Sequence, residues 1–472
     1  MRGATRSLVI MLTTFLAAAA ALAQPAAAPP TTPLEKLAVP PQVTWKLDNG
    51  LQVVLIHDPT VPKVTLLLTF LAGAGSDATL HPGIAQLAAR VMKEGTATRS
   101  SREIREELRS IGGELTVTTD TDATTLTASA LSEFAPRLVA LVADVARNAA
   151  YPKSEVELAK QNLIAEIDEE RSTPDFLANE RLQKALYGNH PYSFVVAEPA
   201  AIAKLTQEQL RAFDAAHYAP NNAHLIVVGD VDEQAMKSEL RKAFGDWAKV
   251  TMPPAATPAT SKRDRRHIDF IDRPGSVQSS IYIGALAAPR KSPDYLAVRT
   301  ANMILGGAFY SRLTRNIREQ KGYTYSPFSE ADLRRTAGAF YMAASVRNEV
   351  TGPTILEMLY ELDRMRIAPV TDEELASAKT FSIGNMAIEL ATQSGLASRV
   401  DTVYTYDLPH DFLEQFAPRV AALTPLDIRK AAAKYFDTYR SAVVIVGDWN
   451  VVQDQVTPFG EVTLYDANGK KK

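Results

Sequence analysis

Cysteine is absent from all 472 residues of this chain. Its absence excludes disulfide bonds, thiol catalysis and zinc sites built on thiolates. Histidine is scarce, and no two histidines are four residues apart, so no helix can present the two imidazoles of an i, i+4 zinc motif. The seven histidines are His57, His81, His190, His217, His224, His267 and His410.

A strong charge of either sign is also missing. The formal net charge is -3, and charged residues make up 22% of the chain. This balance gives no electrostatic reason to expect a nucleic-acid partner. The length is too great for one small domain and favours two or three.

The only long apolar run lies at the N-terminus, behind Arg2 and Arg6. It ends in the small residues Ala21-Leu22-Ala23, which are typical of a signal-peptidase site, so we expect a signal peptide over residues 1–23. The alternative is an uncleaved membrane anchor, but a run of about 16 residues is short for a bilayer span. No cysteine follows the run, which excludes a lipoprotein anchor.

No later segment is apolar for 18 residues, so we expect no membrane span in the mature form. We therefore expect an exported protein, periplasmic in a Gram-negative host. Residues 24–39 are rich in Ala and Pro and are predicted to be a disordered leader.

The chain repeats itself at a constant offset. Each copy has a helix-like segment opening with Leu-Thr, an aromatic residue, and an apolar strand ending in Gly-Asp. The pairs 218 residues apart are Leu205 and Leu423, Arg211 and Arg429, Tyr218 and Phe436, and Gly229 and Gly447. This offset indicates a tandem duplication. Residues 251–266, rich in Pro, Ala and Ser and then basic, are predicted to link domains 40–250 and 267–472.

Within the first copy, strands come before helices. Periodicity predicts strands near 45–57 with an Asn49-Gly50 hairpin, then 64–72, 114–119, 123–130 and 223–229. Helices are predicted from about Pro82 and over 102–111, 133–148, 153–170 and 207–216, with Thr173-Pro174 as a stop. This order predicts an α+β fold in which each half is an antiparallel sheet packed with helices.

Motifs in both halves, in this order, resemble those of the pitrilysin/insulinase metallopeptidases, the inverzincins, which include the mitochondrial processing peptidase. The matching segments are 83–85 with 94–96, 112–116, 190–192, 227–230, 305–307 with 311–313, and 317–326. The resemblance implies two homologous halves that form one side of a clam-shell dimer. It also implies an H-x-x-E-H zinc motif on the first helix and a third ligand, a Glu, on a later helix.

Carried over residue by residue, the zinc motif has lost its chemistry. Gln86 and Arg90 stand where the resemblance places the two histidines, and Ala89 stands where it places the general base. Gln is a poor zinc ligand, Arg is a permanent cation, and Ala cannot accept a proton. Only Glu166 matches, as the third ligand, so we expect no metal in this chain.

The remaining carboxylate suggests an ion pair. Arg90 could place its guanidinium near the vacated metal position and pair with Glu166 across two helices. In the alternative, both side chains face solvent, or Glu166 pairs with a neighbour such as Lys160.

The second half retains an Arg/Tyr pair that the resemblance assigns to substrate and oxyanion contact. Arg318 and Tyr325 are its members, and both side chains can donate to a carbonyl oxygen as it becomes negative. The alternative is a surface helix charge and a strand aromatic. Gly306-Gly307 is predicted to form a tight turn. On the strand that the resemblance places beside the zinc, Thr116 replaces the family's usual Asn.

These residues favour a non-catalytic subunit of an exported heterodimeric zinc metallopeptidase. A homologous partner would carry the zinc, and the substrates would be short unstructured peptides. The alternative is a non-proteolytic binding or assembly protein on the same fold, like the core subunits of respiratory complexes. An active enzyme with an unrecognised site is a third hypothesis.

Overall fold

The computed structural model describes residues 36–76, 81–252, 260 and 263–472. The expected signal peptide, most of the expected leader and half of the expected linker lie outside these residues.

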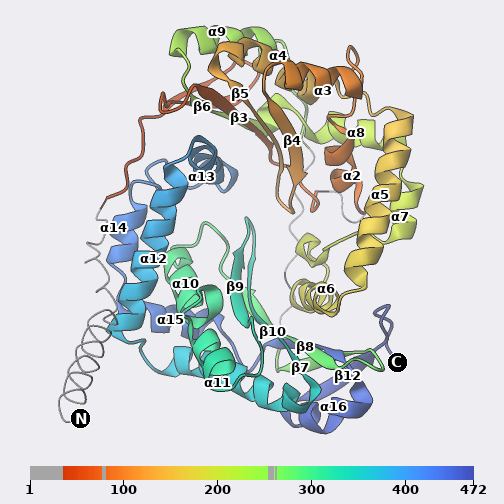
Figure 1. Cartoon of the computed structure of the whole chain (residues 1–472), viewed down its shortest axis with the longest axis vertical. Helices are drawn as coiled ribbons and strands as arrows, with labels where there is room; N and C mark the ends of the chain where they lie inside the picture. The colour runs from red at the N-terminus through yellow and green to blue at the C-terminus, as the bar shows by residue number, and fades with distance from the viewer. Residues whose placement is uncertain (1–35, 77–80, 253–259, 261–262) are drawn as a thin grey trace, which may run out of the picture. The chain divides into compact units, whose positions relative to one another are not determined.

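The described chain contains two six-stranded sheets (Figure 1). The first has the order β1-β2-β6-β3-β5-β4 and the second β12-β7-β11-β8-β10-β9. Their strands are β1 (Val43–Lys46), β2 (Gln52–His57), β3 (Lys63–Phe70), β4 (Glu114–Thr119), β5 (Thr124–Leu131), β6 (Ala223–Gly229), β7 (His267–Asp272), β8 (Gln278–Ala287), β9 (Phe328–Leu333), β10 (Gly338–Arg347), β11 (Ala442–Gly447) and β12 (Glu461–Tyr465). Five positions correspond strand for strand, which confirms the duplicated α+β fold; only β1 and β12 differ.

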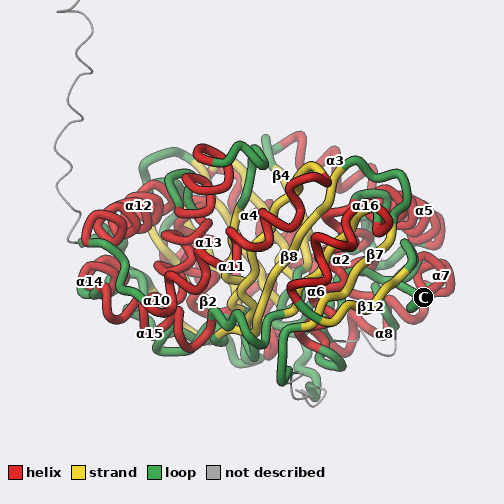
Figure 2. The backbone as a smooth tube through the Cα atoms, turned by 90° about the horizontal axis from the view of Figure 1, so that it is seen from below, coloured by secondary structure: helices red, strands yellow, loops and turns green. Residues whose placement is uncertain are grey.

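Helices lie on both sides of the strands (Figure 2). In the first half they are α2 (Ile84–Val91), α3 (Ser101–Ser110), α4 (Ala135–Asn148), α5 (Lys153–Arg171), α6 (Pro174–Tyr187), α7 (Pro199–Lys204), α8 (Gln207–His217) and α9 (Glu233–Phe244). In the second half they are α10 (Tyr295–Asn302), α11 (Thr351–Ile367), α12 (Asp372–Leu390), α13 (Gln393–Thr405), α14 (Phe416–Ala421), α15 (Pro425–Tyr435) and α16 (Trp449–Val456). No helix among the described residues has the length and apolarity to cross a bilayer.

Equivalent helices begin with equivalent caps. Thr206 and Thr424 cap α8 and α15, each in a reciprocal capping box with the residue three positions later. Thr173 and Thr392 likewise cap α6 and α13 through their side chains. The predicted stop at Thr173-Pro174 is therefore also a start: it ends α5 and opens α6, a helix that periodicity did not predict.

The central strands are buried on both faces, so their sequences are continuous apolar runs rather than alternating ones. In β6, Leu225 and Val227 contact the core of the first half, whereas Ile226 and Val228 face the other way. Strand β11 shows the same division: Val443 packs into one core and Val444 into another. Each sheet therefore needs a helical layer on both faces.

Part of the second layer is exchanged between the halves. Helix α6 of the first half packs on β8 and β11 of the second sheet. Helix α13 of the second half packs on β3 and β6 of the first sheet (Figure 1). Each half thus covers a sheet face of the other, and neither core is complete alone.

A polar cluster marks the α13 exchange. The Asp401 carboxylate of α13 accepts hydrogen bonds from the Thr69 hydroxyl at 2.5 Å and from His224 Nε2 at 2.8 Å. The His224 and Asp401 side chains are 4% and 16% exposed. A carboxylate held this way fixes the register of the exchanged helix on the first sheet.

The hairpin tips of the two sheets also meet, through a main-chain hydrogen bond to an acidic side chain. The β4–β5 tip carries Asp120 and Asp122, and the β9–β10 tip carries Arg334 and Arg335. The Asp122 carboxylate accepts from the Arg335 main-chain N–H at 3.0 Å and from the Tyr192 hydroxyl at 2.5 Å. The bond from Arg335 adds a second fixed point between the halves, and the bond from Tyr192 holds Asp122 in place for it.

Two details differ from the sequence prediction, and a third adds to it. Leu37 belongs to the predicted disordered leader but is only 6% exposed, because it packs into an apolar cluster with Ile56. The sheets are not wholly antiparallel, since β2 and β6 run parallel, as do β7 with β11 and β12. In the expected linker, Arg263 donates to the Ala185 carbonyl oxygen at 3.2 Å.

The cluster at Asp401 should be a main source of stability. Asp401→Ala leaves His224 and Thr69 buried without their acceptor, so we expect a loss of about 3 kcal/mol in unfolding free energy. Urea denaturation followed by circular dichroism measures it. Asp246→Ala is the matched control: Asp246 also pairs with a basic side chain, Arg147, but it is 78% exposed, so we expect a change below about 1 kcal/mol. Equal losses from both variants would contradict this role of the exchanged helix.

Candidate functional site

Helix α2 keeps the packing expected of the zinc-motif helix. Its apolar stripe of Ile84, Leu87, Ala88 and Val91 is buried, as the periodicity predicts. The helix contacts α5, α8 and the edge strand β4. At its start Gly83 has φ +86, and a Cβ there would lie 2.2 Å from Ile202 Cδ1. Glycine is therefore required on two grounds, the left-handed backbone and the close contact.

Arg90 and Glu166 form the ion pair that the sequence suggested. Arg90 Nη1 donates to Glu166 Oε1 at 2.9 Å, and Nη2 donates to Oε2 at 2.5 Å, so the contact is bidentate. The alternative partner Lys160 bonds elsewhere, to the Leu205 carbonyl oxygen at 3.0 Å. Hydrogen bonding from Arg90 lowers the pKa of the Glu166 carboxyl.

This ion pair joins α2 to α5 but adds little stability. The Arg90 and Glu166 side chains are 41% and 50% exposed, so solvent screens their attraction. Exposed pairs contribute about 0.2–1 kcal/mol, and the bidentate geometry favours the upper end of that range. Its main effect is geometric: it occupies the carboxylate that the family resemblance assigns as the third zinc ligand.

The residues at this position do not fit a zinc ion. Both Glu166 oxygens are taken by a guanidinium that would itself repel a cation. Ala89 is 2% exposed, so neighbouring atoms have closed over the place of the general base. Gln86 Oε1 is buried without a hydrogen-bond partner. Across the described residues, no group of three His, Cys, Asp or Glu side chains could hold a metal ion.

An open groove of about 640 Å³ lies at the ion pair. Arg90 and Glu166 line it together with Val117 of β4 and Leu158 of α5. Strand β4 is the edge of its sheet, and Thr116, where the resemblance expected Asn, is exposed on it. A free strand edge beside a groove is a geometry that can accept an extended peptide.

In the second half, Arg318 and Tyr325 lie in contact. Arg318 Cζ is 4.1 Å from the centroid of the Tyr325 ring, and Tyr325 is 77% exposed. Tyr325 lies in the segment between Gln320 and β9, not in a strand, so the alternative of a strand aromatic is wrong. Among the described residues, no carboxylate pairs with Arg318, so its donors are open to a ligand.

A third residue completes a stack. Arg318 Cζ is also 4.8 Å from the centroid of Phe309, whose side chain is 68% exposed. The sequence did not single out Phe309, because its contact with Arg318 depends on the intervening backbone. The only feature of the sequence that could have pointed to Phe309 is its position, as a large apolar residue between Gly307 and the Ser311-Arg312-Leu313 motif.

The backbone carrying this stack is π-helical on both sides of Phe309. The segments are η4 (Met303–Gly307) and η5 (Thr314–Gln320), and η5 carries Arg318. π-Helical turns are rare, and they concentrate at functional sites. The predicted Gly306-Gly307 tight turn is wrong: both glycines end η4. A Cβ on Gly306 would lie 2.6 Å from Ser329 N, so close packing accounts for the absence of a side chain there.

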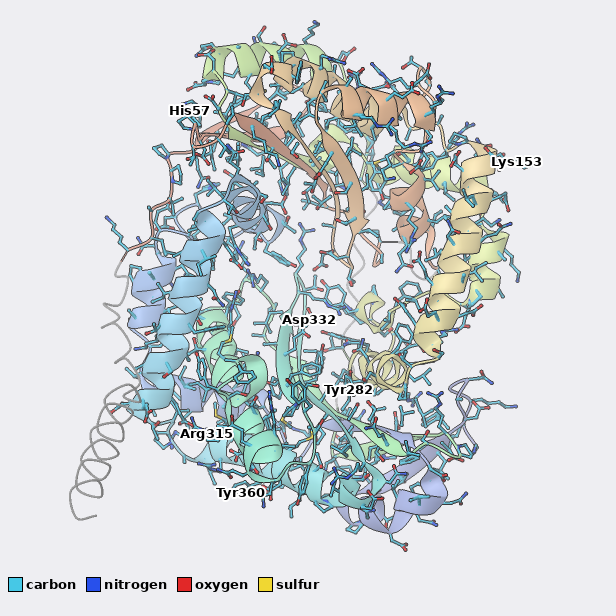
Figure 3. The ribbon with its side chains drawn as sticks, in the orientation of Figure 1. His57, Lys153, Tyr282, Arg315, Asp332 and Tyr360 are labelled. Carbon is cyan, nitrogen blue, oxygen red and sulfur yellow. The ribbon has the colours of Figure 1, made fainter. Side chains whose placement is uncertain are left out.

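The structure therefore pairs Arg90 with Glu166 and Arg318 with Tyr325. No described hydrogen bond, ion pair or ring contact connects one pair to the other. Figure 3 shows the side chains of both halves, with Lys153 marking the start of α5 and Arg315 lying in the same segment as Arg318.

If Gln86 and Arg90 hold former ligand positions, histidines there should recover a zinc site. The double variant Gln86→His/Arg90→His presents two imidazoles at i, i+4 and releases Glu166 to act as the third ligand. We expect it to bind zinc in a stoichiometric amount, measured by metal analysis after dialysis, whereas the native chain does not.

Adding Glu166→Gln to the double variant is the matched control and should weaken zinc binding. A double variant that takes up no zinc would show that these positions do not correspond to the motif.

Two models of one peptidase family match the chain. Residues 52–200 match "Insulinase (Peptidase family M16)", and residues 204–381 match "Peptidase M16 inactive domain". The uncharacterized zinc protease YmxG of Bacillus subtilis is 25% identical over 359 residues, covering 74% of this chain and 85% of that protein. An uncharacterized zinc protease of Rickettsia felis is 24% identical over 413 residues, covering 85% and 96%.

Solved structures agree. The peptidase M16 inactive domain from Pseudomonas fluorescens superposes with a TM-score of 0.80 at 26% identity, covering 86% of this chain and 98% of that one. A protease from Helicobacter pylori also gives 0.80, at 20% identity and with 86% and 100% coverage, and shows the fold alone. Together these matches show that the chain belongs to the insulinase family, peptidase family M16.

Proposed function

We propose that this chain is the non-catalytic subunit of an exported heterodimeric zinc metallopeptidase. A homologous partner binds the zinc, and this chain contacts the substrate through Arg318 and Tyr325. The substrates are short unstructured peptides. Export is supported by the N-terminal sequence, with its two arginines, apolar run and Ala21-Leu22-Ala23.

One observation carries this proposal: in the part of the chain that the structure describes, the first half has no residues that fit a metal ion, whereas the second half keeps an exposed Arg/Tyr pair. In the first half, Gln86, Ala89 and Arg90 do not fit a metal ion. In the second, Tyr325 stays 77% exposed against a guanidinium that has no carboxylate partner among the described residues. An exposed aromatic ring and a π-helical backbone both cost stability, and such features persist where function requires them.

The chemistry of this pair suits a substrate carbonyl. A phenol O–H and a guanidinium N–H are both donors, and they stabilise an oxygen most when it carries negative charge. Arg318 packs against the rings of Phe309 and Tyr325, and no carboxylate among the described residues pairs with it, so its N–H groups are available to a ligand. The pair can therefore assist hydrolysis at a zinc ion that another chain holds.

A second candidate is a non-proteolytic binding or assembly protein. The groove at Arg90 and Glu166, beside the edge strand β4, supports it, because a peptide could bind there without being cut. The two candidates differ in whether this chain changes the activity of a zinc subunit.

Reconstitution tests the proposal. A homologous H-x-x-E-H chain, co-purified from the same cells, should cleave a fluorogenic unstructured peptide only when this chain is added. In that complex Tyr325→Phe keeps the ring on Arg318 but removes the hydroxyl donor, so we expect kcat to fall about a hundredfold.

Tyr439→Phe is the matched control, because Tyr439 is also a tyrosine of the second half, 75% exposed, with Arg366 near its ring. It should leave kcat unchanged. Equal activity of the zinc subunit with and without this chain would overturn the proposal and favour the binding protein.

A further inference from the structure

Two arginines outside the sites described above converge on a single phenol oxygen. Arg290, in the connection from β8 to α10, donates from Nη1 to the hydroxyl oxygen of Tyr295. Arg299 of α10 donates from its own Nη1 to the same oxygen at 2.9 Å. A phenol oxygen has two lone pairs, so these two bonds use its whole accepting capacity.

Neither guanidinium has a carboxylate partner in the described part of the chain. The nearby carboxylates pair with other cations: Glu389 with Arg399 at 2.5 Å, and Asp407 with Lys291. Burial lowers the pKa of the Arg299 guanidinium, but Tyr295 and Glu389 raise it, and the net shift is upward. Arg290 and Arg299 therefore each make one side-chain hydrogen bond, to a neutral acceptor, and most of their donors have no partner among the described residues.

Packing holds Arg290 in place without neutralising it. Its Cζ lies 4.1 Å from the Tyr295 ring centroid and 5.3 Å from that of Tyr406. Its Nε is buried without a hydrogen-bond partner. Burial lowers the pKa of the Arg290 guanidinium, and the neighbouring Arg299 and Arg399 act in the same direction. Two cations withdrawn from water beside each other are unfavourable unless an anion joins them.

The location suggests where such an anion comes from. The Arg290 main-chain N–H donates at 2.8 Å to the carbonyl oxygen of Arg334, the residue that follows β9. Strand β9 is the edge of the second sheet, and Asp332, labelled in Figure 3, lies near this end of it. An extended peptide that pairs with a strand edge presents its terminal group at the end of that strand.

We propose that Arg290 and Arg299 form a binding site for the C-terminal carboxylate of a peptide. A carboxylate is planar and accepts N–H bonds from guanidinium forks, and it would neutralise the local excess of positive charge. This site is separate from the Arg318–Tyr325 pair, and it rests on the proposed function only in taking a peptide as the source of the carboxylate.

Calorimetric titration of the isolated full-length chain tests the site without any zinc subunit. The probe is acetyl-tetraalanine with a free C-terminal carboxylate, compared with the same peptide ending in an amide. We expect the acid to bind at least about tenfold more tightly than the amide, because charge-assisted bonds are lost with the amide. Added sodium chloride should weaken the binding of the acid.

Two variants locate the binding. Arg290→Gln and Arg299→Gln should each abolish the preference for the acid, and thermal unfolding shows whether each remains folded. Arg299→Gln keeps the test decisive if the more buried Arg290 proves essential for folding. Arg315→Gln is the matched control, an exposed arginine of the same half labelled in Figure 3, and should keep the preference.

Equal binding of acid and amide, or an unchanged preference in a folded arginine variant, would overturn the proposal. A parallel titration with sodium phosphate separates the two sources of an oxyanion. Phosphate binding that needs both arginines, without binding of the peptide acid, would assign the site to phosphate and also overturn it. Because no peptidase activity is measured, failure here leaves the proposed subunit role to be judged by reconstitution.

Discussion

Mutual coverage of two sheets is the constraint on which the rest of this structure depends. The central strands β6 and β11 are apolar on both faces, so each sheet exposes a large surface unless a second layer covers it. Helices α6 and α13 supply part of that layer, and each comes from the opposite half. The two halves are therefore one folding unit, although the sequence presents them as two copies.

This arrangement explains how one site could lose its chemistry while the fold survived. The zinc-motif helix contributes to the core through Ile84, Leu87, Ala88 and Val91, which lie on a different face from Gln86 and Arg90. Replacing ligands on the outer face leaves that core intact. The bidentate contact from Arg90 to Glu166 links α2 to α5 without a metal ion. The packing of α2 therefore places no requirement for a metal-binding side chain on positions 86 and 90.

The sequence predicted local features well and long-range packing poorly. The i, i+3, i+4 pattern located α2, and the offset of 218 residues located the duplication, because both depend on neighbouring residues or on direct comparison. The contact from Arg90 to Glu166 was foreseen only as one of two alternatives, since it depends on the approach of α5. The exchange of α6 and α13, the stack on Phe309 and the convergence on Tyr295 were not foreseen. Each depends on the three-dimensional course of the backbone, and no residue pattern indicates which sheet a helix will cover.

The proposed function assigns the zinc chemistry to a partner, and the charges at Arg90 and Arg318 are consistent with that assignment. A zinc ion is a strong Lewis acid with an open coordination position, whereas a guanidinium is a weakly hydrated cation whose bonds are made entirely by N–H donors. Arg90 can satisfy Glu166 but cannot activate a water molecule. Arg318 has the same chemistry in a different setting: it lies against two aromatic rings with no described carboxylate beside it, so its donors remain available. Such donors stabilise an oxyanion only after a nucleophile has attacked, and nothing at Arg90, Ala89 or Gln86 can generate that nucleophile. In the proposed function, Arg318 and Tyr325 therefore act together with a metal that a partner holds.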